Sequence, residues 1–130
     1  MEKIKMKDLT KAEEQIMHIL WSIKKGFVND IMESLPEPKP AYNTVSTIVR
    51  ILEKKGFVDH AAYGKTHEYF PLVSKDKYTK SFLNGFVENY FSNSYQNMVS
   101  FFSKNEDMTT KEIEDIIKIL QEQVDSKKNS

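Results

Sequence analysis

The hydrophobic pattern of this chain changes from the period of a helix to that of a strand at Gly56. Before that glycine, apolar residues recur every three or four positions, which is the spacing of amphipathic helices. After it, residues 57–63 and 67–70 alternate between apolar and polar side chains, which predicts two strands joined by residues 64–66 (Gly-Lys-Thr). A helical region that gives way to one short hairpin leaves few folds open to the first half of the chain.

Three helices are predicted before the hairpin. The first begins at a capping box of Thr10 and Glu13 and is closed by Gly26. A second covers about residues 29–35, and a third covers residues 42–55. Three helices followed by a hairpin is the order of elements in a winged helix-turn-helix domain.

The third predicted helix has an apolar face and a polar face. Asparagine can bond adenine through two hydrogen bonds, arginine can do the same to guanine, and threonine can offer its hydroxyl or its methyl group. Helix-turn-helix proteins place the start of such a helix in the major groove, and a basic hairpin tip reaches phosphates or the minor groove. We therefore expect DNA contacts from Tyr42, Asn43, Thr44, Ser46, Thr47, Arg50, Lys54, Lys65 and Thr66.

Charge supports this interpretation only locally. The formal net charge of the whole chain is zero. Residues 39–67, however, hold five basic and two acidic side chains, a surplus of three, whereas residues 74–130 hold eight basic and nine acidic ones. Because phosphate attraction is screened within about 10 Å, the local surplus matters more than the total.

From Ser74 onward, the predicted helices carry wide apolar stripes rich in aromatic residues. The segment contains little else that could cover them, so a homodimer interface is the simplest way to bury them, with an interior core or a ligand pocket as alternatives. A twofold dimer also suits a pseudo-palindromic DNA site. The residues expected at this interface are Tyr78, Phe82, Phe86, Tyr90, Phe91, Met98, Phe102, Ile113, Ile116, Ile117 and Leu120.

Together these patterns predict a mainly α-helical protein with a small β-hairpin wing. Residues 1–73 are expected to form a winged helix-turn-helix domain and residues 74–130 a helical dimerisation domain. The predicted function is a repressor that binds double-stranded operator DNA as a homodimer.

Several other classes of protein are disfavoured. The chain has no cysteine, which excludes disulfides, thiolate metal sites and cysteine nucleophiles. It has no apolar stretch long enough to span a bilayer and no signal peptide, so we expect a cytoplasmic protein without membrane insertion. No phosphate loop or catalytic constellation is apparent, and we expect neither enzymatic activity nor a cofactor.

The sequence raises three further interpretations beside operator binding. The histidines His18, His60 and His67 match no ligand spacing, so no metal site is expected. A winged helix can instead serve as a protein-interaction module without specific DNA binding, since solvated helix faces often carry Asn, Ser, Thr and Arg. A small-molecule sensor with its pocket among the aromatic helices is a third hypothesis, compatible with the first.

The residues also resemble a known family, the BlaI/MecI penicillinase repressors, to which the copper-responsive CopY repressors belong. The resemblance extends from Leu9 to about Gln121 and rests on several segments taken in order. These are Leu-Thr-Lys-Ala-Glu at 9–13, Ile-Leu-Trp at 19–21, Tyr-Asn-Thr-Val-Ser-Thr-Ile-Val-Arg-Ile-Leu-Glu-Lys-Lys-Gly at 42–56, Phe-Ser-Lys-Asn-Glu-Asp at 102–107 and Lys-Glu-Ile-Glu at 111–114.

This resemblance implies a winged-helix N-terminal domain, a helical dimerisation domain and repression of an adjacent or divergent operon. In the antibiotic-responsive branch, a membrane-bound zinc-protease sensor triggers cleavage of the repressor between an Asn and a Phe. Those positions correspond to Phe101 and Phe102, so the family's Asn is absent here. The cysteine motif of the CopY branch is absent too. The antibiotic-responsive members carry more basic residues where this chain has Asn43 and Ser46, and their operator contact carries over best at Thr44.

Overall fold

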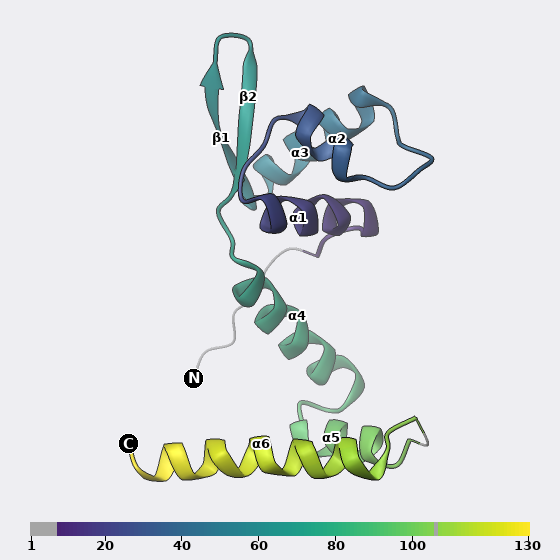
Figure 1. Ribbon diagram of the computed structural model, residues 1–130, viewed down its shortest axis with the longest axis vertical. Helices are drawn as coiled ribbons and strands as arrows, with labels where there is room; N and C mark the ends of the chain where they lie inside the picture. The colour runs from purple at the N-terminus through teal and green to yellow at the C-terminus, as the bar shows by residue number, and fades with distance from the viewer. Residues whose placement is uncertain (1–7, 106) are drawn as a thin grey trace. The chain divides into compact units, whose positions relative to one another are not determined.

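The computed structural model describes residues 8–105 and 107–130. Figure 1 shows the elements in chain order: α1 (Lys11–Ile23), α2 (Val28–Ser34), α3 (Tyr42–Lys54), β1 (Val58–Tyr63), β2 (Thr66–Pro71), α4 (Lys75–Tyr90), α5 (Tyr95–Ser103) and α6 (Thr110–Lys128). The predicted fold class, mainly helical with a β-hairpin wing, is confirmed. The chain divides into two compact units, one ending at Leu83 and one starting at Asn84, so the division falls inside α4.

Helix α1 starts where its capping residues predict. The Glu13 N–H donates to Thr10 Oγ1 over 3.1 Å, and the Thr10 N–H donates to Glu13 Oε1 over 2.9 Å. The two side chains thereby satisfy backbone N–H groups that the first turn leaves free. The predicted closure by Gly26 is wrong: the helix ends at Ile23, and the next residue, Lys24, has a positive φ of 75°.

Gly26 attaches the hairpin to the helices instead of capping α1. Its N–H donates to the Tyr69 carbonyl over 2.9 Å, and the Tyr69 N–H donates to the Gly26 carbonyl over 2.8 Å. The approach is close, because a Cβ on Gly26 would lie 2.8 Å from Ile23 Cδ1 and 3.1 Å from Asp30 Cβ. Because the two bonds hold the Gly26 backbone in place and an added Cβ would clash with the Ile23 side chain, this position favours glycine.

Helix α3 follows its predicted bounds closely. Its apolar stripe places Val45, Val49 and Leu52 in the core, as expected from helical periodicity. Gly56 follows the helix with φ of 84°, and its N–H donates to the Glu53 carbonyl. A left-handed glycine at this position ends the helix and turns the chain into β1.

Strands β1 and β2 form an antiparallel pair in which Val58 faces Pro71 and Tyr63 faces Thr66. The connection is therefore Gly64-Lys65, one residue shorter than predicted, and Thr66 is the first residue of β2. Gly64 has a φ of 63°, which suits a two-residue hairpin turn. The Thr66 hydroxyl donates to the Tyr63 carbonyl over 2.7 Å and closes the turn.

The first unit has one hydrophobic core. Tyr78, at the start of α4, belongs to it: its ring packs near Trp21 and Phe57. The Trp21 Nε1–H donates to the Val73 carbonyl over 2.8 Å, which ties the segment before α4 to α1. The buried residues of this core are Ile16, Met17, Leu20, Val28, Ile31, Leu35, Val45, Val49, Leu52, Phe57, Val58, Tyr69 and Tyr78.

The second unit is held by aromatic contacts between the end of α4 and α5. Phe91 lies with its ring 5.6 Å from that of Phe86 and 5.7 Å from that of Phe101. Helix α6 begins at a second capping box, in which Thr109 and Glu112 exchange hydrogen bonds as the sequence predicts. Neither α5 nor α6 buries any residue fully. Among the described residues, no helix combines the length and the apolar character needed to cross a membrane.

Candidate nucleic-acid interface

Helix α3 presents one exposed row of polar side chains. Its members are spaced by three or four residues, so they lie along the side opposite the buried stripe. Three of the predicted contacts on α3 stand apart from the row: Thr44 is exposed on one flank, and Tyr42 and Ser46 lie on the flank beside the wing. The row consists of Asn43, Thr47, Arg50 and Lys54.

The groups in this row differ in how free they are. The Thr47 hydroxyl donates to the Asn43 carbonyl over 2.8 Å, which uses its hydrogen and leaves the oxygen able only to accept from a ligand. Arg50 Nε makes one long bond, 3.4 Å, to the Ser46 carbonyl. Among residues 8–105 and 107–130, the side chains of Asn43 and Lys54 have no hydrogen-bond partner. From the N-terminal to the C-terminal end of α3, the row offers a ligand an amide, a methyl, a guanidinium and an ammonium group.

The wing and α3 border a hollow of about 480 Å³. The structure brings four predicted contact residues to its wall: Tyr42 and Ser46 from α3, and Lys65 and Thr66 from the hairpin. The wall also contains residues that sequence reasoning did not select for this role, namely Phe27, Val28, Asn29, Asp30, His67 and Tyr69. The period-2 alternation in β2 would have indicated His67, because it shares a face with the buried Tyr69.

Two of the basic residues counted in the local surplus point elsewhere. Lys55 Nζ lies 2.7 Å from Glu13 Oε1 and 3.3 Å from the Asp8 carbonyl, so it joins the end of α3 to the start of α1. Lys39 Nζ donates to the Met32 carbonyl over 2.8 Å, near the C-terminal end of α2. The basic groups left for an anionic ligand on α3 and the wing are Arg50, Lys54 and Lys65.

The Lys55 contact also sets the ionisation of Glu13. Burial raises the pKa of the Glu13 carboxyl, but the hydrogen bonds from Lys55 and from the Thr10 backbone outweigh burial. The pKa therefore lies below its ordinary value of 4.5. Glu13 is ionised at neutral pH and serves the fold rather than a ligand.

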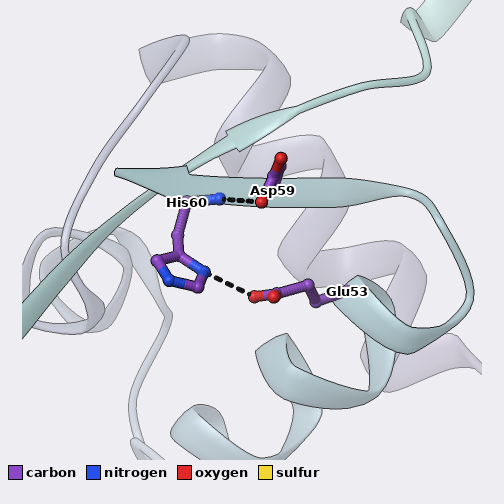
Figure 2. Close-up of side chains that lie close together, drawn as sticks. All are labelled: Glu53, Asp59 and His60. Carbon is purple, nitrogen blue, oxygen red and sulfur yellow. Dashed lines mark hydrogen bonds and ion pairs between the residues drawn. The ribbon is translucent and has the colours of Figure 1, made fainter. Parts of the chain in front are cut away.

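Figure 2 shows a titratable cluster between the end of α3 and β1. His60 Nδ1 lies 2.9 Å from Glu53 Oε1, and the His60 N–H donates to Asp59 Oδ1 over 2.8 Å. One ligand atom from each residue falls within 4.8 Å of the others. These hydrogen bonds account for the arrangement without a metal ion. His18 is not part of it: that ring lies beside Trp21 and 3.8 Å from Glu14 on α1.

The residues expected at a dimer interface are placed in different surroundings. Tyr78 is only 9% exposed and lies in the core of the first unit, so its ring is already covered within one chain. Phe82, Tyr90, Phe102, Ile116, Ile117 and Leu120 are exposed, and Phe86, Phe91, Met98 and Ile113 are half-buried. Exposed apolar residues that the prediction omitted include Tyr95, Val99, Phe101, Ile119 and Val124.

The known proteins that resemble this chain do so over most of its length. Residues 9–122 match the family described as penicillinase repressor. The methicillin resistance regulatory protein MecI of Staphylococcus aureus (strain N315) is 28% identical over 114 residues, which cover 87% of this chain and 93% of that protein. The penicillinase repressor of Bacillus licheniformis is 24% identical over 125 residues, 95% of this chain and 98% of that protein.

One solved structure supports the fold. The solution structure of the DNA binding domain of the repressor BlaI matches with a TM-score of 0.50 at 24% identity, over 59% of this chain and 94% of that one. At this identity the likeness concerns the architecture alone. It agrees with the winged helix predicted from the order of helices and hairpin.

Proposed function

Because this chain belongs to the penicillinase repressor family, we propose that it is a transcriptional repressor that binds double-stranded operator DNA as a homodimer in the cytoplasm. The observation that carries the proposal is the exposed row on α3, a helix whose Tyr42 and Ser46 border the same hollow as Lys65 and Thr66 of the wing. A helix of this kind fits the major groove, and a two-residue basic turn beside it fits the adjacent backbone.

In this proposal the individual side chains have separate tasks. Asn43 and Thr47, in the first half of α3, contact base edges, as an amide suits adenine and a methyl suits thymine. Arg50 bonds guanine or a phosphate. The Lys65 ammonium and the Thr66 end of β2 contact phosphates, which set the position on DNA without reading its sequence. Tyr42, Thr44, Ser46 and Lys54 complete the proposed contact surface.

Fluorescence anisotropy tests operator binding directly. The probe is a labelled duplex from the region upstream of the protein's own gene, with a scrambled duplex as control, at two salt concentrations. We expect selective binding that weakens steeply with salt, because each neutralised phosphate releases counterions. Equal, weak binding to both duplexes would contradict an operator in that region. Binding to neither, at any salt, would favour the alternative of a protein-interaction module.

Arg50→Ala sharpens the test. We expect it to weaken operator binding by roughly tenfold or more, equivalent to about 1–3 kcal/mol for one base contact. The free energy of unfolding of the Arg50→Ala protein should differ little from that of the wild type, because Arg50 is exposed and makes one long hydrogen bond. Lys118→Ala, which removes a positive charge from α6, is the matched control. Equal affinity of the two variants would remove Arg50 from the proposed contact surface.

The dimer rests on the second unit. Helices α5 and α6 bury no residue fully, while exposed apolar side chains continue along both. An apolar surface of this kind is unusual on a monomer and typical of an obligate interface. We infer that Phe82, Phe86, Tyr90, Phe91, Met98, Phe102, Ile113, Ile116, Ile117 and Leu120 meet a second copy. Tyr78 is left out, since the core of the first unit already covers its ring.

Relief of repression by proteolysis is a separate part of the proposal. The family resemblance places the cut at the bond between Phe101 and Phe102, and both rings are exposed on α5. Co-expression with a membrane-bound zinc-protease sensor from the same genome, followed by mass spectrometry, tests it. A fragment ending at Phe101 would support cleavage there. An intact chain in induced cells would leave relief to another signal.

A further inference from the structure

A side-chain hydrogen bond joins the end of α3 to the hairpin. His60 Nδ1 on β1 lies 2.9 Å from Oε1 of Glu53, in the last turn of α3, and both side chains are half-buried. Figure 2 shows the Glu53 carboxylate directed at the His60 ring. Among residues 8–105 and 107–130, no other side-chain hydrogen bond connects α3 with β1 or β2. Since a hydrogen bond is directional and apolar packing is not, this contact fixes the hairpin on α3 more narrowly than the core does.

The contact continues toward the tip of the wing. The rings of His60 and His67 are stacked, 4.0 Å apart with an angle of 7° between their planes. Both side chains leave the face of the hairpin that holds the buried Tyr69. His67 borders the hollow between the wing and α3, as does Lys65 in the turn two residues before it. A path of contacts therefore leads from Glu53 through two rings to the tip.

Other contacts of the outer half of the hairpin are longer or less directional. The Tyr63 ring lies 6.0 Å from the ring of Phe27, and Lys25 Nζ lies 4.0 Å from Glu68 Oε1 with the lysine mostly exposed. A two-stranded hairpin is only marginally stable by itself. The place of Lys65 in front of a ligand therefore depends on the contacts that attach the hairpin to the helices.

We propose that Glu53 is a positioning residue for DNA binding. Through His60 and the stacked His67, it holds the wing where Lys65 reaches a phosphate while α3 lies in the major groove. This inference rests on the proposed function, since it needs the DNA backbone to pass the wing. A carboxylate repels phosphates, so Glu53 assists binding only through the side chains that it positions.

Two substitutions of Glu53 separate the contact from the charge. Glu53→Gln and Glu53→Ala both remove the carboxylate, but only glutamine keeps an oxygen that accepts from His60. By anisotropy with the full chain and the operator duplex, we expect the alanine variant to bind about threefold more weakly per half-site than the glutamine variant. The slope of log affinity against log salt should also become shallower by about one per subunit, because the Lys65 phosphate contact is lost.

A third variant repeats the test with the charge kept. Glu53→Asp shortens the side chain by one methylene, so its oxygens no longer reach His60, and it should bind more weakly than the wild type by a similar factor. Urea denaturation verifies that each variant is folded under the conditions of the assay. Glu53→Asp that binds as tightly as the wild type would overturn the inference.

A positioning role also predicts coupling between Glu53 and Lys65. In a Lys65→Ala background the wing has no ammonium group to place, so Glu53→Ala and Glu53→Gln should bind the operator equally. Lys118→Ala, on α6, is the control background, in which the threefold difference should remain. A difference that persists without Lys65 would assign Glu53 to the fold in general and overturn the inference, while operator binding itself stands. Wild-type protein that binds no duplex would overturn the proposed function, and this inference with it.

Discussion

At the scale of single residues, one hydroxyl ties α4 to α1. Tyr78 donates to Glu14 Oε2 over 3.2 Å, and its ring is almost fully buried. Burial, followed by the charge of Glu14, raises the pKa of Tyr78 to about 12 from an ordinary 10.0. The native state therefore prefers the protonated phenol, and this preference contributes stability below pH 10 that is lost as pH rises toward 12.

We expect Tyr78→Phe to lower the free energy of unfolding by about 1 kcal/mol at pH 7, the usual contribution of one hydrogen bond. The difference from the wild type should shrink above pH 10, because phenylalanine cannot ionise. Urea denaturation at pH 7 and pH 11 measures both effects. Tyr63→Phe, at an exposed position of β1, is the control and should match the wild type. A constant gap across this pH range would contradict the pKa argument.

Glu13 makes a second prediction at this scale, with the opposite sign in pH. Its pKa is lowered in the native state, so the stabilisation is present above pH 4.5 and is lost as pH falls below that value. We expect Glu13→Gln to cost about 1–3 kcal/mol at pH 7, since Lys55 loses its partner in a half-buried place. The cost should shrink as pH falls further below 4.5 and the wild-type carboxyl itself takes up a proton.

Denaturation curves at pH 7 and pH 3 check this expectation. Glu112→Gln provides a comparison, because Glu112 closes the same type of capping box on α6 without a lysine partner. A smaller loss of stability in Glu112→Gln would assign the additional loss in Glu13→Gln to the Lys55 contact. If Glu13→Gln costs the same at both pH values, packing rather than charge explains it.

At the scale of elements, two glycines of the chain should respond oppositely to alanine. Gly26 connects the α1–α2 loop to β2, and an added Cβ would press on Ile23 and Asp30. We expect Gly26→Ala to destabilise the first unit by about 1–2 kcal/mol, through displaced side chains. Gly85, inside α4, has nothing within 4 Å of the added atom, and Gly85→Ala should stabilise by about 0.5–1 kcal/mol.

Urea denaturation of both variants decides the point. The two substitutions add the same methyl group, so the contrast isolates the local space and the helix propensity. Destabilisation by Gly85→Ala would indicate a contact with a partner at that position. A neutral Gly26→Ala would mean that the hairpin attachment tolerates a shift of Ile23.

At the scale of the whole molecule, two isoleucines that lie two residues apart, and so on different sides of α6, test the dimer. Ile117 lies within the stripe that includes Ile113, Leu120 and Val124, whereas Ile119 lies about 120° from its centre. Their exposed fractions are nearly equal, 60% and 58%. Side-chain type and exposure are therefore matched, and only the face differs.

We expect Ile117→Glu to convert the protein to a monomer at micromolar concentration, as measured by light scattering. Operator affinity should fall by roughly tenfold or more, since two linked half-site contacts become independent. Ile119→Glu should remain dimeric. A wild-type monomer, or equal loss of the dimer in both variants, would contradict the proposed interface.

Local chemistry made much of the first unit predictable. Thr10 and Glu13 form the predicted capping box, and Gly56 turns the chain after α3, because both signals act over a few residues. The repeats of 3.6 and 2 likewise placed the α3 stripe and the hairpin. Gly26 was misassigned because its role is not local. It pairs with Tyr69, which is distant in sequence.

By itself, then, the sequence determined the order and type of the elements, the polar row on α3 and the apolar stripes of α4 to α6, since each depends on periodicity within one segment. Only the tertiary structure decided which basic side chains stay available beside the wing and which ones bind elsewhere in the protein. It turned Lys55 toward Glu13, stacked His60 on His67, and put Tyr78 into the core instead of on an exposed stripe. These outcomes depend on contacts between residues far apart in the chain, and no local pattern records which side chains folding brings together.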